Sequence, residues 1–150
     1  MYNKILIPLD GSELSECVLP HVKNLIKEGA AREVIILNVV GVDIPWDEMD
    51  KGIDFSAIRQ QLLSTSENYV ESLAARLSAE GIKVTAESIE YSRPAASIVE
   101  YAKKNNVDLI VMATHGYSGI QKFLMGSVAF KVLHESHIPV LLIRPESCAA

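Results

Sequence analysis

The sequence predicts an α/β fold, with a parallel sheet and helices packed on both of its faces. Short apolar runs that suit strands alternate along the chain with longer segments whose apolar residues recur at helical spacing. The runs at 4–9, 33–40 and 107–113 are apolar almost throughout, which is the pattern of strands buried on both faces. Strands that alternate with helices are joined by right-handed crossovers, so helices cover both sides of the sheet.

Each element follows from a local signal. The first strand, at 4–9, ends at Asp10-Gly11-Ser12, and Ser12 is a candidate N-cap for a helix that Gly29 ends. The remaining elements are a strand at 33–40, a loop at 41–54, a long helix from about 55 that Gly81 ends, a strand at 82–89 near a sheet edge, a helix starting at 92–94, a strand at 107–113, a helix at 127–136 and a strand at 139–143.

Length and composition indicate a single domain, residues 1–150, and narrow the function classes. The net charge of −5 argues against sequence-independent binding to the phosphates of nucleic acids. No apolar run approaches the roughly 20 residues that a membrane span needs, and the start of the chain lacks a signal-peptide pattern. Cys17 and Cys148 match no metal or redox spacing. We therefore expect a cytoplasmic protein with free thiols.

Polar and glycine residues gather after two of the predicted strands. Asp10-Gly11-Ser12 follows the first strand, and Thr114 to Gly119 follows the fourth. Ligands of parallel α/β sheets bind beyond the carboxyl ends of the strands, where the strand order reverses. If these two strands are neighbours, both clusters line one binding crevice.

The loop from Ala113 to Ser127 contains Gly116, Gly119 and Gly126 and leads into a helix. Glycines allow a tight turn and the close approach of a ligand, and the N–H groups at a helix start favour an anion such as phosphate. The same residues also suit a plain turn with Ser127 as the helix cap, so the chemistry alone leaves both interpretations open. No P-loop, dinucleotide-binding fingerprint or serine-hydrolase elbow is present.

Asp10 has two interpretations as well. An ionised carboxylate at the carboxyl end of the first strand can accept hydrogen bonds from both ribose hydroxyls of a nucleotide. The same residue could instead form an Asp-Gly turn or stabilise the start of the following helix.

Together these residues resemble the universal stress protein family along the whole chain. The resemblance lies in I-L-I-P-L-D-G-S at the start, N-V-V and V-M-A-T-H-G at two strand ends, and G-S-V-A-F-K-V-L followed by I-P-V-L-L-I-R-P. The ATP-binding subgroup of that family has the pattern G-x-x-G-x9-G-[ST], which falls here on Ala113, Gly116, Gly126 and Ser127. Ala113 departs from the pattern, and we expect its methyl group to leave nucleotide affinity weaker or unchanged rather than to abolish binding.

The resemblance implies a three-layer, Rossmann-like fold whose open, twisted sheet has five parallel strands in the order 3-2-1-4-5. It also implies a site for an adenine nucleotide, with Asp10 on the ribose hydroxyls and the Val39 backbone on the adenine edge. The other predicted site residues line the base and ribose (Pro8, Leu9, Met112 and Ala113) or face the phosphates (Gly116, Gly119, Gly126, Ser127 and Val128). No residue is assigned a catalytic or metal-binding role.

The last strand predicts an oligomer. Val140, Leu141, Leu142 and Ile143 are apolar, and little sequence follows that could cover their outer edge, which invites pairing with another chain. The resemblance implies a two-fold homodimer in which this strand pairs antiparallel with its copy.

The expected function is regulatory binding of ATP, or of ADP, AMP or cyclic AMP, in the stress response, with little or no catalysis. A Mg²⁺ ion bridging the phosphates is an option, although the loop offers no carboxylate to hold it. Two alternatives stay open. One is a slow ATPase or autokinase, for which Asp10 and His115 are the acid–base candidates. The other is a dimeric interaction module without a ligand.

Overall fold

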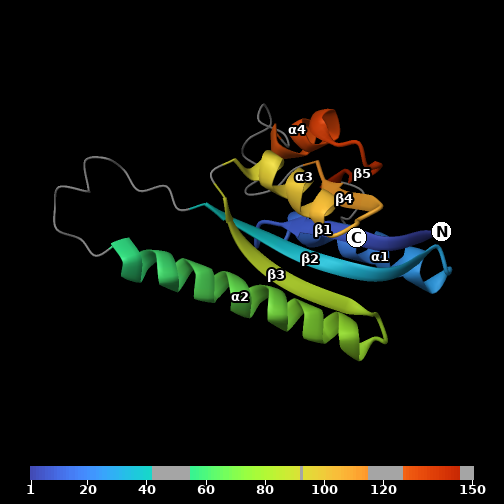
Figure 1. Cartoon of the computed structure of the whole chain (residues 1–150). Coiled ribbons are helices and arrows are strands. Elements are labelled where there is room, and N and C mark those ends of the chain that lie inside the picture. The colour runs from blue at the N-terminus through green and yellow to red at the C-terminus, as the bar shows by residue number, and fades with distance from the viewer. Residues whose placement is uncertain (42–54, 92, 115–126, 146–150) are drawn as a thin grey trace.

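The computed structural model confirms the predicted sheet. Five parallel strands lie in the order β3-β2-β1-β4-β5, with helices on both faces (Figure 1). The structure describes residues 1–41, 55–91, 93–114 and 127–145. The strands are β1 (Tyr2–Leu9), β2 (Ala31–Gly41), β3 (Val84–Tyr91), β4 (Leu109–Ala113) and β5 (Val140–Ile143); the helices are the 3-10 turn η1 (Ser15–Val18), α1 (Leu19–Lys27), α2 (Phe55–Ala79), α3 (Pro94–Lys104) and α4 (Ser127–Glu135).

Most predicted elements are present within a few residues of their expected bounds. Gly29 and Gly81 follow the ends of α1 and α2 with φ of +71° and +85°, a conformation that suits glycine at a helix C-terminus. α3 begins at Pro94, where the missing N–H costs nothing. β3 is an edge strand, as its alternating pattern predicted. Of the loop predicted at 41–54, Gly41 belongs to β2, and residues 42–54 lie outside the described residues.

The helix expected directly after Ser12 starts later than predicted. The chain first forms the 3-10 turn η1, and the α-helix begins at Leu19. Pro20, in the first turn of α1, has no N–H to donate to the carbonyl of Glu16, so an α-helix cannot run through this point unbroken. The N–H of Leu19 bonds instead to the carbonyl of Glu16, which gives the tighter turn.

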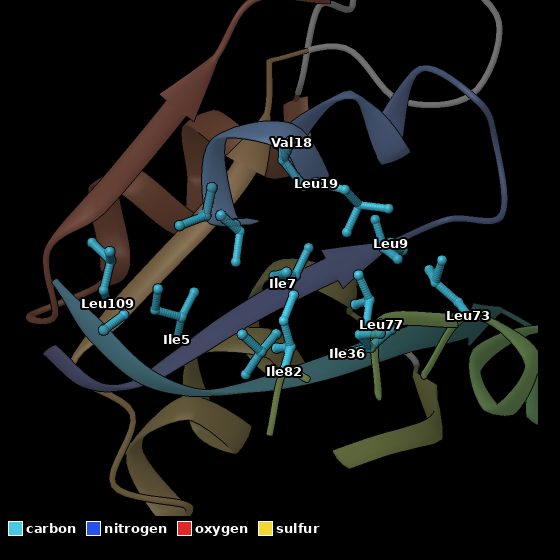
Figure 2. Packing of buried hydrophobic residues seen from close by; sticks show 14 of the residues in the cluster. Ile5, Ile7, Leu9, Val18, Leu19, Ile36, Leu73, Leu77, Ile82 and Leu109 are labelled. Atoms are coloured by element: carbon cyan, nitrogen blue, oxygen red, sulfur yellow. The ribbon is translucent and has the colours of Figure 1, made fainter. Parts of the chain in front are cut away.

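Two apolar layers fill the space between sheet and helices. On the face covered by η1, α1 and α2, residues such as Ile5, Ile7 and Ile36 pack against Val18 and Leu73 (Figure 2). The face covered by α3 and α4 buries a second cluster around Leu6, Leu37, Ile98, Ile110 and Val132. Each fully buried isoleucine or leucine contributes about 1.5–3 kcal/mol relative to an exposed one. The sheet is therefore a rigid base for whatever lies at its edges.

Candidate functional site

The candidate site lies at the carboxyl edge of the sheet, where β1 lies next to β4. These two strands pair at Ile5 with Leu109 and at Leu6 with Ile110, yet each strand runs three residues further. β1 stays paired with β2 as far as Leu9 with Asn38. β1 thus stays paired with β2 to its end, whereas the last three residues of β1 and of β4 do not pair with each other. β1 and β4 are neighbours, as the predicted binding crevice requires.

Asp10 stands directly after β1 and is held by a short network of hydrogen bonds. Its Oδ1 accepts from the backbone N–H of Ser12 at 2.9 Å and from the Ser12 hydroxyl at 2.5 Å. Ser12 Oγ in turn accepts from the N–H of Ser15 at 3.1 Å, and Ser15 Oγ donates to the Ser12 carbonyl at 2.9 Å. The predicted role of Ser12 as the helix cap is wrong, because α1 begins after Val18. Its hydroxyl instead holds the turn before η1 through Ser15 and fixes the carboxylate of Asp10.

A tyrosine of α2 ties this segment to the rest of the molecule. Tyr69 Oη donates to Glu16 Oε2 at 2.8 Å, which joins α2 to η1. Burial raises the pKa of the Tyr69 phenol above its usual value, and the hydrogen bond to Glu16 raises it further. Tyr69 is therefore a neutral hydrogen-bond donor at physiological pH, and the turn after Asp10 is anchored to a long helix.

The predicted base and ribose residues fall on two faces of the sheet. Val39, Met112 and Val128 all pack on the cluster beneath α3 and α4. Leu9 and Ala113 belong instead to the cluster on the α1 side. Any contact that these two residues make with a ligand beneath α4 must therefore come from their backbone. For Ala113 this means that the methyl group points away from that side of the sheet.

Pro8 and Thr114 shape the two strand ends. Pro8 is buried in β1 and has no N–H, so it cannot donate to either neighbouring strand. The N–H of Thr114 donates to the carbonyl of Ile143 at 2.8 Å, which ties the end of β4 to β5 rather than to β1. Both features are consistent with the early end of the ladder between β1 and β4.

Residues 115–126 of the predicted phosphate loop lie outside the described residues. They include His115 and the three glycines Gly116, Gly119 and Gly126. The two ends of the loop are described. β4 delivers the chain to this edge at Ala113, and α4 begins at Ser127, which is exposed. The N–H groups of the first turn of a helix have no partner within the helix, so this end of α4 can attract an anion.

Gly41 and Tyr91 also lie at this edge but were not among the predicted site residues. β2 and β3 run on beyond the end of β1 and pair as far as Gly41 with Tyr91, whose side chain lies over that glycine. The contact depends on the pairing register of two strands far apart in the sequence. The one signal in the sequence is a lone glycine at the end of an apolar run, which can mark a close approach by another group.

No helix within the described ranges could cross a bilayer. The same residues contain no group of three His, Cys, Asp or Glu side chains placed to hold a metal ion.

Related proteins match the chain nearly from end to end. Universal stress protein MJ0531 of Methanocaldococcus jannaschii is 35% identical over 144 residues, which cover 96% of this chain and 83% of that protein. The solved structure of MJ0577 from the same organism is similar with a TM-score of 0.80 at 33% identity, over 96% of both chains.

Two more distant structures share the fold and were solved with a nucleotide. One is a universal stress protein in complex with cAMP, with a TM-score of 0.65 at 20% identity over 96% of this chain and 98% of that one. The other, from Arabidopsis thaliana with AMP bound, has a TM-score of 0.67 at 16% identity over 95% and 91%. The family model of the universal stress proteins matches residues 1–144. The chain belongs to the universal stress protein family.

Proposed function

We propose that this chain binds an adenine nucleotide at the carboxyl edge of its sheet and acts as a regulatory protein in the stress response. The observation that carries the proposal is the junction beside Asp10, where neighbouring strands β1 and β4 stop pairing before either strand ends. Ligands of open α/β sheets bind at such a point. The AMP and cAMP complexes of two proteins with this fold support an adenine nucleotide as the ligand.

In this proposal each part of the nucleotide has its own partners. The carboxylate of Asp10 accepts hydrogen bonds from the ribose hydroxyls, and the backbone of Val39 bonds the adenine edge. Pro8 and Met112 line the pocket with apolar surface, whereas Leu9 and Ala113 contribute backbone. The phosphates lie at the start of α4, next to the N–H groups of Ser127 and Val128, and the glycines of the loop (Gly116, Gly119 and Gly126) complete the cradle.

ATP is the nucleotide that we propose first, because the glycine pattern resembles that of the ATP-binding subgroup; ADP, AMP and cyclic AMP share the adenosine that Asp10 and Val39 would hold. A Mg²⁺ ion would be held by the phosphates, since the described residues offer no cluster of metal ligands. The sequence supplies only Asp10 and His115 as acid–base candidates at this edge, so we propose slow hydrolysis at most.

We further propose that the chain is a cytoplasmic homodimer joined through β5. This strand forms one edge of the sheet, and Leu141 on it is 37% exposed. An apolar edge strand with unpaired backbone groups favours pairing with a second chain.

Calorimetric titration with ATP tests the nucleotide proposal. The wild-type chain should bind, and Asp10→Asn should weaken binding by about 10-fold to 100-fold, because hydrogen bonds to a charged group contribute about 1.5–3 kcal/mol. Asp108→Asn is the matched control. Its carboxylate accepts from the N–H groups of Asn3 and Lys4, at the other end of β1, so ATP affinity should stay unchanged.

A wild-type chain that takes up no ATP, ADP, AMP or cyclic AMP would refute the proposal and favour the ligand-free interaction module. Phosphate release measured in the same samples separates the binding protein from an ATPase. We expect less than one turnover per binding site during the titration.

A further inference from the structure

Beyond the end of β1, strands β2 and β3 form a two-stranded extension beside Asp10. The pairing of β1 with β2 ends at Leu9 with Asn38, whereas β2 and β3 stay paired through Val39–Ile89 to Gly41–Tyr91. Three further residues at about 3.3 Å each carry this extension roughly 10 Å past the end of β1. We call this extension, residues 39–41 and 89–91, the β2–β3 ribbon. Any ligand that binds at Asp10 has this ribbon as its neighbour on the β2 side.

The ribbon presents Gly41 and Tyr91 on the same face as the predicted pocket. Val39 and Ile89 pack on the cluster beneath α3 and α4. Side chains alternate along a strand, so residues two positions further, Gly41 and Tyr91, face the same side. Because Gly41 has no side chain, the next side chain on this face beyond Val39 is that of Tyr91 on the neighbouring strand β3.

The Tyr91 ring lies directly over the backbone of Gly41. A Cβ atom on Gly41 would lie 2.5 Å from Tyr91 Oη, 2.6 Å from Cζ and 3.2 Å from Cε1. The ring can therefore occupy this place only because residue 41 lacks a side chain. Tyr91 itself is half-buried, so its ring packs on the ribbon and keeps part of its surface open to a ligand.

The strand order fixes the direction in which a bound nucleotide would extend. Its phosphates would lie at the start of α4, which follows β4, and its ribose at Asp10, which follows β1. The base must then continue in the same direction, across Val39 of β2 and toward β3. Tyr91 of β3 stands at the end of that path.

We propose that Tyr91, seated on Gly41, forms the outer wall of the base pocket and gives this chain a preference for purine over pyrimidine nucleotides. The inference rests on the proposed nucleotide site. A purine has two fused rings and extends further from the ribose than the single ring of a pyrimidine. A purine whose edge bonds Val39 therefore also contacts the tyrosine ring, whereas a pyrimidine does not reach the tyrosine. Aromatic side chains hold bases through contact between the rings.

The test compares ATP with CTP, which differ only in the base, by calorimetric titration of the full chain. Tyr91→Ala should weaken ATP binding about tenfold, the size typical of the loss of one base–aromatic contact, and leave the CTP affinity within twofold. Tyr91→Phe should keep the wild-type preference. Gly41→Ala should act like Tyr91→Ala, because the new methyl group displaces the ring. The double variant should lose no more than Tyr91→Ala alone.

Tyr101→Ala is the control for loss of a half-buried tyrosine. Tyr101 lies on α3, packs on the same apolar cluster and donates to Glu87 Oε2 at 2.5 Å, seven residues from the end of the helix nearest the site. It should lower thermal stability without changing the ratio of ATP to CTP affinity. Equal loss of ATP and CTP binding in Tyr91→Ala, or no loss, would overturn the inference while the proposed function stands. Absence of ATP binding in the wild type would overturn both.

Discussion

Asp10 and Ser12 form one hydrogen-bonded unit at the residue scale. The Ser12 hydroxyl donates to Asp10 Oδ1 while it accepts from the N–H of Ser15, so its proton is directed at the carboxylate. A carboxylate that is already oriented loses less conformational freedom when a ligand binds. On this account Ser12 contributes to nucleotide affinity without touching the nucleotide.

Replacement of Ser12 tests this role. Ser12→Ala should weaken ATP binding about fivefold, in line with about 1 kcal/mol for one hydrogen bond, and Ser12→Thr should restore it. The affinity for 2′,3′-dideoxy-ATP, which lacks the hydroxyls that Asp10 is proposed to bind, should change little. Calorimetry with both nucleotides gives the answer, and an equal loss for the two would show that Ser12 supports the fold alone.

Asp10 could be predicted as a candidate because it directly follows an apolar run typical of a buried strand. Position alone left a turn-forming or helix-stabilising role open, and the ribose role was implied by the family resemblance. Ser12 was predicted as a cap but not as the partner of Asp10, since that contact depends on the turn between them. Tyr91, which we propose as a wall of the base pocket, was not among the predicted residues. Its place over Gly41 is set by the register of β2 and β3, which are joined by more than 40 residues.

At the scale of elements, three of the six large exposed apolar side chains in the described part of the chain lie on β5 and α4. Leu141 on β5 is 37% exposed, and Phe130 and Leu133 on the neighbouring helix α4 are 54% and 45% exposed. Apolar side chains on an edge strand and on the helix beside it are what a dimer interface would bury.

Leu141→Lys should therefore convert a dimer to a monomer, because a lysine on the edge strand opposes pairing with a second copy. Light scattering at micromolar concentration should give twice the chain mass of 16.5 kDa for the wild type and a single chain mass for the variant. Ile58→Lys is the control. Ile58 is 43% exposed but lies on α2, which packs on β3 at the opposite edge of the sheet from β5. A wild-type monomer, or a Leu141→Lys dimer, would contradict the β5 interface.

Element types were predictable because periodicity reports burial, and the three most apolar runs became the three central strands, β1, β2 and β4. The start of the first helix was not. The apolar spacing after Ser12 suits a helix, but Pro20 removes a donor that an α-helix through Glu16 needs, and η1 forms instead. A single missing N–H outweighed the pattern of the side chains around it.

For the whole molecule, the decisive feature is the place of β1 in the sheet. β1 lies between β2 and β4, so the chain leaves β1 and β4 side by side at the same edge of the sheet. This is the strand order that the family resemblance implied. No periodicity in the sequence could show that the ladder between β1 and β4 ends early, because the pairing of two strands far apart in the sequence leaves no periodic signal. The glycine loop stays a prediction from sequence, since residues 115–126 lie outside the described part of the chain.

The most direct test of the central claim is to ask what the protein already carries. The purified chain would be denatured, and the released small molecules identified by mass spectrometry, with the Asp10→Asn variant prepared in parallel. We predict an adenine nucleotide from the wild type and much less from Asp10→Asn. If the wild type carries none and takes none up when incubated with millimolar ATP, the chain is not a nucleotide-binding protein.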